Sequence, residues 1–202
     1  MRINWNGHAC FTVITSEGSA VFDPYAPDSV PGFKLPELSA DAVFCSHGHG
    51  DHNFAEGVKL SGKTPSFSVH SIPCFHDECG GAKRGDNLIT VIEAEGLRLA
   101  HFGDIGHLLS EEQLQQVGAV DIMLIPVGGF FTVGPDEAKQ LCDAVGAKVI
   151  IPMHYRGKDY GYDKIGPVEP FLKKFDEKCI TRLPTPELEI SAVDEKRVIV
   201  FG

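Results

Sequence analysis

The stretch Phe44-Cys45-Ser46-His47-Gly48-His49-Gly50-Asp51-His52 decides the fold, because it places four potential metal ligands within six residues. An apolar run at 42–45 leads into it and predicts a buried strand that delivers the chain to the cluster. His47 and His49 are two residues apart, so both imidazoles point the same way in an extended segment. Glycines at alternate positions permit a tight backbone path. Since imidazole and carboxylate bind Zn²⁺, Mn²⁺ and iron, the stretch predicts a metal site.

The composition is that of a globular protein and argues against several other classes. The chain has 202 residues, of which 43% are hydrophobic and 23% charged, and this suits one domain spanning 1–202. No apolar run approaches the roughly 20 residues of a membrane helix, and we expect no signal peptide. The net charge of −10 argues against nucleic-acid or anionic-membrane surfaces, which need clustered Lys and Arg. We expect a cytoplasmic protein whose partner is a small-molecule substrate, with no nucleic acid and no membrane.

Six cysteines are spread along the chain without a CxxC pair. Without a secretory segment they predict free, mostly buried thiols of a reducing compartment. Cys79, in a glycine-rich loop, could face the site, but no base at a usable spacing marks it as a nucleophile.

Short apolar and alternating runs predict a strand-rich first half, then alternating helices and strands, then strands again. A hairpin is expected from 10–14 and 20–22, and Glu95-Gly96 marks a second hairpin turn. Further strands are expected at 42–45, 67–72, 88–93, 97–102, 122–126, 149–152, 180–183, 188–192 and 198–201. Helices are expected after an N-cap at Ser110 and at 135–145, 167–175 and 53–60. This order suits two packed sheets with helices outside.

The ligand stretch resembles the HxHxDH signature of the metallo-β-lactamase superfamily, and the resemblance extends over nearly the whole chain. It looks closest to the Zn-dependent hydrolases of the β-lactamase fold, the branch that includes the ascorbate-phosphate lactonase. The supporting segments are 6–11, 22–24, 100–107, 126–129 and 151–155. The resemblance implies an α+β fold, a four-layer αββα sandwich with metals at one edge between the sheets.

That family needs three more ligands, and the resemblance assigns each to a residue that follows an apolar run. His76 matches the third motif, Asp104 the bridging carboxylate and His154 the last histidine. His70 competes with His76, but it lies inside its alternating run rather than at the end. Independently of the family, side chains at strand ends can converge on one rim without being buried unpaired.

The resemblance implies a dinuclear site with seven ligands. One divalent ion would be held by His47, His49 and His76, and the second by Asp51, His52 and His154, with Asp104 bridging. Zn²⁺ is the expected ion, with Mn²⁺ or iron as alternatives. Hydroxide shared by the two ions would cleave a small ester, lactone or phosphodiester, and Asp51 would join the catalytic group. The alternative is a non-catalytic metal-binding or sensor module; seven ligands favour the hydrolase, since a structural site closes with four.

Four further residues have competing interpretations. His107 follows Asp104 by three residues and is the candidate general acid, whereas helix capping or solvent exposure are its ordinary roles. His8 is expected at a turn, either lining the site or hydrogen-bonded within a hairpin. Asp23 would orient a metal-bound histidine or simply start a turn. Tyr155 could bind a substrate anion.

Overall fold

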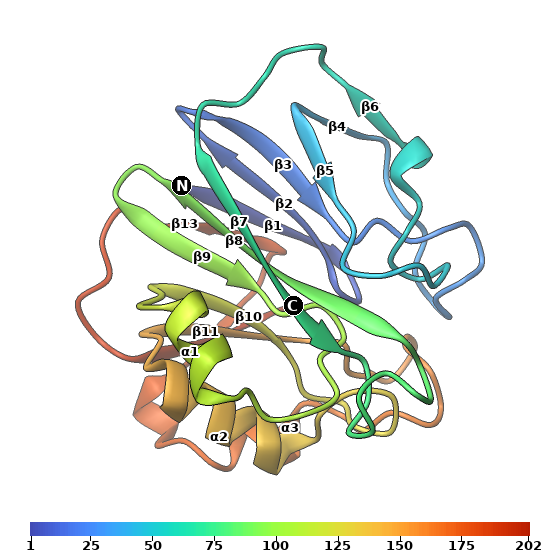
Figure 1. Cartoon of the computed structure of the whole chain (residues 1–202), viewed down its shortest axis with the longest axis vertical. Coiled ribbons are helices and arrows are strands. Elements are labelled where there is room, and N and C mark those ends of the chain that lie inside the picture. The colour runs from blue at the N-terminus through green and yellow to red at the C-terminus, as the bar shows by residue number, and fades with distance from the viewer.

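Two β-sheets face each other in the computed structural model, which describes residues 1–202 (Figure 1). The first has five strands, in the order β13 (Glu187–Glu189), β1 (Arg2–Gly7), β2 (Cys10–Thr15), β3 (Gly18–Phe22) and β5 (Ala42–Phe44). The second has seven, in the order β12 (Ile180–Leu183), β14 (Arg197–Phe201), β11 (Val149–Met153), β10 (Ile122–Pro126), β9 (Leu97–His101), β8 (Asp86–Ala94) and β7 (Ser68–Phe75). Both sheets mix parallel and antiparallel pairs, so the predicted α+β class is confirmed.

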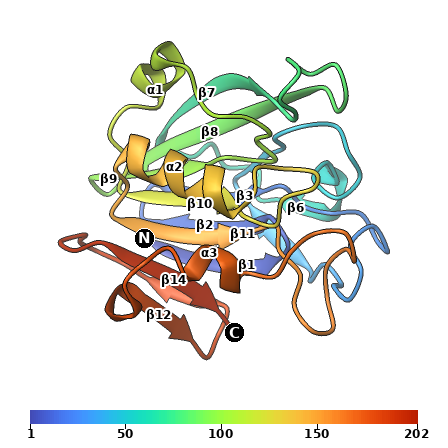
Figure 2. The ribbon, with the colours of Figure 1, turned by 90° about the horizontal axis from the view of Figure 1, so that it is seen from below.

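Three α-helices accompany the seven-stranded sheet: α1 (Glu111–Val117), α2 (Pro135–Val145) and α3 (Glu169–Leu172). Figure 2 shows α2 and α3 lying over β10 and β11, on the face turned away from the five-stranded sheet. Ser110 caps α1 through a reciprocal capping box with Gln113, as its N-cap position predicts. Pro135 opens α2, and Gly146 ends it in the left-handed conformation with φ of 72°. No helix in the structure has both the length and the apolar character that a membrane span needs.

The main core lies between the sheets and beneath the helices, because side chains alternate along each strand. Phe11 and Phe22 point into this core of 46 buried residues. Their neighbours Cys10 and Val21 point the other way, into a small outer cluster that includes Val58. The outer cluster lies beside a two-stranded sheet, β4 (Leu38–Ala40) with β6 (Val58–Leu60), and a 3₁₀ turn, η1 (Ala55–Gly57).

The helix predicted at 53–60 is therefore wrong. Residues 55–57 form only one 3₁₀ turn, and 58–60 pair in parallel with β4. Val58 is the only buried residue of β6, and its side chain packs in the outer cluster. The segment therefore has no apolar stripe for a helix to bury, and its backbone pairs with β4 instead. The layer outside the five-stranded sheet consequently contains no α-helix, although the sandwich architecture is as predicted.

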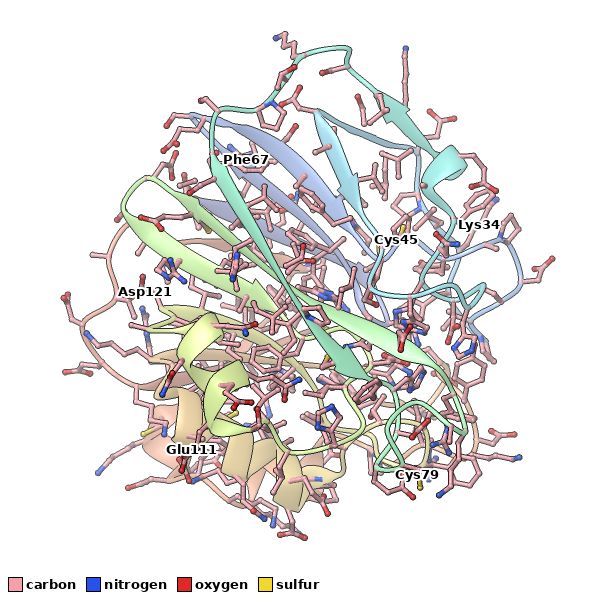
Figure 3. All side chains as sticks on the ribbon, viewed as in Figure 1. Lys34, Cys45, Phe67, Cys79, Glu111 and Asp121 are labelled. Carbon is pink, nitrogen blue, oxygen red and sulfur yellow. The ribbon has the colours of Figure 1, made fainter.

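The six cysteines are free thiols, as predicted, with Cys10, Cys74 and Cys142 buried. Figure 3 shows Cys79 at the surface, on the loop that follows β7. This loop and three others follow the ends of β5, β7, β9 and β11, and together they carry most of the residues of the site described below.

β7 is the outer strand of the seven-stranded sheet, and the segment 106–113 covers its last residues. Gly106 donates its N–H to the carbonyl of Phe75 at 3.0 Å. Phe75 donates its own N–H to Nε2 of His107 at 3.1 Å, and Gln113 donates from Nε2 to the carbonyl of Pro73 at 2.9 Å. These bonds satisfy backbone groups that the edge of a sheet would otherwise leave open.

Candidate metal centre

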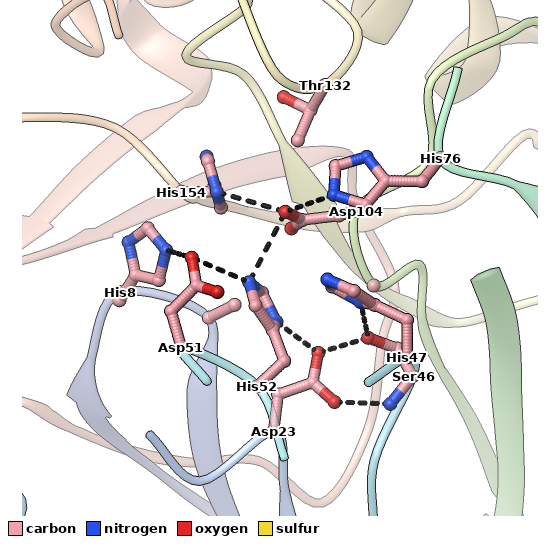
Figure 4. A network of polar contacts seen from close by, with 12 residues as sticks. His8, Asp23, Ser46, His47, Asp51, His52, His76, Asp104, Thr132 and His154 are labelled. Atoms are coloured by element: carbon pink, nitrogen blue, oxygen red, sulfur yellow. Dashed lines mark hydrogen bonds and ion pairs between the residues drawn. The ribbon is translucent and has the colours of Figure 1, made fainter. Parts of the chain in front are cut away.

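The structure brings all seven predicted ligands into one cluster around a buried carboxylate. Figure 4 shows this carboxylate, Asp104, in contact with His52, His76 and His154. Oδ2 of Asp104 lies 3.3 Å from Nε2 of His52, 3.3 Å from Nε2 of His76 and 3.1 Å from Nε2 of His154. Asp104 follows β9, and the parallel order of β9, β10 and β11 brings the end of β11, and hence His154, to the same edge. Asp104 therefore lies against imidazoles from three separate segments of the chain.

The ligand atoms of the cluster form three overlapping groups, one of which joins His47, His52 and Asp104. His47, His49 and His76 have ligand atoms within 4.8 Å of one another. A second group under the same limit contains Asp51, His52, His154 and also His8. The histidine at 70, by contrast, is exposed on β7, which agrees with the preference for His76.

The residues of this cluster fit a bound cation, because their polar atoms lack protein partners. Nine buried side-chain N and O atoms in the chain have no hydrogen-bond partner, and all but Asn4 Oδ1 belong to this cluster. They come from His8, His47, His52, His76, Asp104 and His154. Such atoms are rare in folded proteins and cost about 1–3 kcal/mol each when unsatisfied. Imidazole nitrogens together with carboxylate oxygens form a donor set that suits Zn²⁺, Mn²⁺ or iron.

Asp23 fixes the orientation of two of these imidazoles. Its Oδ2 accepts hydrogen bonds from Nδ1 of His52 at 2.7 Å and from Oγ of Ser46 at 2.6 Å. Oγ of Ser46 in turn accepts from Nδ1 of His47 at 2.9 Å. With both Nδ1 atoms donating, the Nε2 atoms of His47 and His52 face the cluster. This contact favours the interpretation in which Asp23 orients a histidine of the cluster.

The charge state of the cluster follows from burial and from its carboxylates. Burial, together with neighbouring His52, lowers the pKa of His47 to about 3, and burial with neighbouring His154 lowers that of His8 to about 4. Both rings therefore offer neutral nitrogens near pH 7. Burial also opposes charge on His52, but Asp104 and Asp23 outweigh it and raise the pKa of His52 well above its ordinary value. The surrounding histidines hold the pKa of Asp104 well below the ordinary range, against the effect of burial.

His8 belongs to the cluster, which sequence reasoning left open. It lies at the turn between β1 and β2 with φ of 54°, is fully buried, and places Nε2 3.5 Å from Oδ2 of Asp51. Its ring lies against that of His154 in a tilted arrangement, with centroids 4.1 Å apart and 44° between the ring planes. The sequence does contain a signal for this position, because apolar Ile3 and Trp5 alternate with polar residues and so indicate the strand β1. A strand that ends just before His8 would have placed this histidine at a strand end, like the other candidate ligands.

His107 is not brought to the cluster, so its predicted place at the rim of the site is wrong. It lines a separate surface groove, where Nε2 accepts from Phe75 and Nδ1 donates to the carbonyl of Leu108 at 2.7 Å. Gly106 explains the path, because a Cβ there would lie 2.4 Å from the backbone of His76 and so only glycine fits. The chain passes tightly behind His76 and emerges along the outer edge of β7.

Tyr155 is also directed away from the cluster. It is buried and stacks on Trp5, with ring centroids 6.0 Å apart. The exposed Cys79 is absent from the residues that line the pocket over the cluster.

A pocket of about 310 Å³ opens over the cluster, and its wall contains three residues that the sequence did not single out. They are Arg84, Phe131 and Tyr162, which share the lining with His49, Asp51, His76, Asp104 and His154. The hydroxyl of Tyr162 lies 2.6 Å from the carbonyl of Ser29 and 3.1 Å from Oδ2 of Asp51. These residues come from loops far apart in sequence, so no local spacing marks them.

Comparison with known proteins gives consistent relatives. The family model of the beta-lactamase superfamily domain matches residues 2–154. A UPF0173 metal-dependent hydrolase of Alkaliphilus metalliredigens is 32% identical over 197 residues, covering 77% of this chain and 85% of the relative. The crystal structure of a proposed Zn-dependent hydrolase of the metallo-beta-lactamase superfamily from Thermotoga maritima superposes with a TM-score of 0.80 at 34% identity, covering 99% and 97% of the two chains. Igni18, a metallo hydrolase of Ignicoccus hospitalis, shares the fold with a TM-score of 0.63 at 19% identity, covering 86% and 89%.

Proposed function

Since the chain belongs to the UPF0173 metal-dependent hydrolases of the beta-lactamase superfamily, we propose that it hydrolyses a small ester, lactone or phosphodiester at a dinuclear metal site. The observation that carries this proposal is the cluster of buried, unpartnered imidazole and carboxylate atoms at the floor of an open pocket. Zn²⁺ is the first candidate because the similar Thermotoga maritima protein is described as Zn-dependent, and Mn²⁺ or iron would suit the same donors.

We assign the ligands as two of the geometric groups suggest. His47, His49 and His76 would hold one cation, Asp51, His52 and His154 the other, and Asp104 would bridge them. His8 lies at the second group as a further donor or as a support for Asp51. Divalent cations held here would supply Lewis acidity and a water acidic enough to act as a nucleophile near neutral pH.

The chain's own residues would prepare this chemistry by orientation. Asp23 and Ser46 keep the Nε2 atoms of His47 and His52 directed inward. The hydroxyl of Tyr162, beside Asp51, restrains that carboxylate at the pocket wall. Because Asp23 and Ser46 follow closely on the ends of β3 and β5, the histidines that they orient are pre-organised for a cation.

A sensor or other non-catalytic metal module is the competing function. The pocket argues against it, because His49, Asp51, His76, Asp104 and His154 all contribute to the pocket surface. A purely structural metal would be closed off by four ligands, whereas a catalytic site keeps a position open to substrate.

Metal analysis combined with a substrate screen tests the proposal. We expect close to two metal ions per purified chain, and His47→Ala with His49→Ala to lose at least one. His70→Ala is the matched control, because that histidine is exposed on β7 outside the cluster. Equal metal content in the double variant and the wild type would contradict the ligand assignment. Full metal content without hydrolysis across ester, lactone and phosphodiester panels would favour the sensor function.

A further inference from the structure

One cationic side chain, Arg84, lines the pocket without an ion pair, and a second, Lys164, lies over the ring of the nearby Phe130. Arg84 lines the pocket, and its guanidinium contacts only the carbonyl of Phe130 and the ring of Phe131. Lys164 lies over the ring of Phe130, with Nζ 5.1 Å from the centroid, and forms no ion pair. In a chain of net charge −10, these two side chains place positive charge near the metal-ligand cluster. They raise the potential at the point where a substrate enters.

Arg84 is held at both ends, so its guanidinium is positioned before any ligand arrives. Its backbone N–H donates to Oδ2 of Asp77 at 2.8 Å. The buried carboxylate of Asp77 also accepts the N–H groups of Cys79, Gly81 and Lys83, at 2.8, 3.0 and 2.9 Å, and so fixes the whole loop. At the other end, Nη2 of Arg84 donates to the carbonyl of Phe130 at 2.9 Å. The remaining guanidinium N–H groups have no acceptor in the protein and are available to a ligand.

Aromatic rings surround these cations. Phe130 and Phe131 meet edge to face with centroids 4.7 Å apart, and Phe131 lies 5.8 Å from Tyr162. Phe130 is 57% exposed and holds φ of 62°, a conformation that a bulky side chain seldom adopts. Such a strained backbone conformation persists where the surrounding structure imposes it. In this conformation the carbonyl of Phe130 accepts the hydrogen bond from Arg84. The mouth therefore combines an apolar wall with a fixed positive group.

We propose that Arg84 is a substrate-recognition residue that binds an anionic group, a carboxylate or a phosphate, located away from the bond that is cleaved. Phe131 contacts the apolar part of the substrate, and Lys164 adds attraction at the entrance. The pocket of about 310 Å³ limits this substrate to a small molecule. The inference rests on the proposed hydrolytic function and specifies its substrate class. A neutral substrate would gain no charge-assisted hydrogen bond from this guanidinium, so the site favours the anion.

A matched pair of chromogenic esters tests the proposal. 4-Nitrophenyl hexanoate is neutral, whereas mono-4-nitrophenyl adipate has the same leaving group and the same six-carbon acyl chain but ends in a carboxylate. We expect the wild type to favour the adipate monoester in kcat/KM, and Arg84→Gln to reduce that ratio roughly tenfold or more, as loss of a charge-assisted hydrogen bond requires. Arg84→Lys restores part of the ratio, and Lys164→Gln reduces it less. Lys83→Gln is the control, because Lys83 pairs with Glu78 on the exposed side of the same loop.

A ratio in Arg84→Gln equal to that of the wild type would overturn the proposal. Calorimetry on the purified proteins decides the question if neither ester is hydrolysed. Glutarate, glycerol 3-phosphate and neutral glutaramide are the probes, and the tighter of the two anions identifies the preferred group. We expect anion binding to weaken roughly tenfold or more in Arg84→Gln at unchanged metal content. Equal anion affinity in both proteins refutes the role of Arg84, whereas anion binding without hydrolysis or metal refutes only the proposed function.

Discussion

Replacing Asp23 by Asn removes one acceptor from a site where three donors converge. In the wild type, Oδ1 accepts from the N–H of Ser46 at 2.6 Å, and Oδ2 accepts from Oγ of Ser46 and Nδ1 of His52. Whichever way the Asn amide is turned, its NH₂ group faces a donor. The backbone N–H of Ser46 cannot change, but His52 can move its proton from Nδ1 to Nε2. Asn also tolerates the φ of 43° at this position, so the backbone does not confound the experiment.

The magnitude follows from what the tautomer change does to His52. A proton on Nε2 faces Asp104 at 3.3 Å and occupies the lone pair that a cation needs. Loss of such an orienting carboxylate typically lowers metal affinity 10- to 100-fold. That range corresponds to about 1.4–2.8 kcal/mol of binding free energy. We therefore expect Asp23→Asn to bind metal 10- to 100-fold more weakly than the wild type, with the fold retained.

Competition against a chromophoric zinc chelator measures this affinity, and circular dichroism with thermal melting reports the fold. Asp41→Asn is a matched control, because Asp41 also accepts hydrogen bonds from a serine N–H and hydroxyl, those of Ser19 at 2.8 and 2.9 Å. Asp41 precedes β5, whereas the ligand cluster follows the other end of that strand. Ser46→Ala is a milder variant that spares the bond between Asp23 and His52. Wild-type metal affinity in a folded Asp23→Asn protein would refute the tautomer argument.

Three further outcomes are expected. His107→Ala keeps its metal and stays within a few-fold of wild-type activity, since His107 only caps Phe75 on the edge of β7; a large loss of kcat would return it to the catalytic group. Gly103→Ala lowers the free energy of unfolding by about 2–5 kcal/mol in denaturant titration, because φ is 53° and a Cβ would lie 2.3 Å from Oδ1 of Asn87; a change below about 1 kcal/mol would contradict this. DNA and RNA show no salt-sensitive binding in a filter assay, given the net charge of −10, and tight binding that weakens steeply with salt would overturn that expectation.

The HxHxDH part of the cluster was predictable because its signal is local, whereas His76, Asp104 and His154 were assigned through the family resemblance. His47, His49 and His52 lie in one short stretch, and the end of an alternating run distinguishes His76 from His70. Strand ends of a sandwich meet at a common edge, so knowledge of the strands was nearly enough to bring these side chains together.

The wall of the pocket could not be predicted in the same way. His8 reaches Asp51 from the first turn of the chain, and Arg84 meets Phe131 from the loop after another strand. Those contacts depend on tertiary packing, which leaves no spacing in the sequence. His107 illustrates the opposite case, in which residues close in sequence lie apart in the structure. It follows Asp104 by only three residues, but the tight passage of Gly106 behind His76 directs the chain along β7 and away from the cluster.

Secondary structure was missed where an element is too short to show a period. β4 and β6 have three residues each, which cannot reveal an alternation. α3 has four residues, 169–172, although the apolar spacing at 167–175 is typical of a longer helix. β13 ends at Glu189 rather than at 192. Long elements such as β8 and α2 lie where their patterns predict them.

The covered edge of β7 has a consequence for how the molecule behaves in concentrated solution. The backbone groups of Pro73 and Phe75 that face away from β8 form hydrogen bonds with the segment 106–113. By the alternation of the strand, Val69 and Ser71 alone remain open toward solvent. Two residues are too few to template another strand of ordinary length. The intact chain should therefore resist edge-to-edge aggregation on this side, and deletion of 106–113 would expose a ready site for fibre growth.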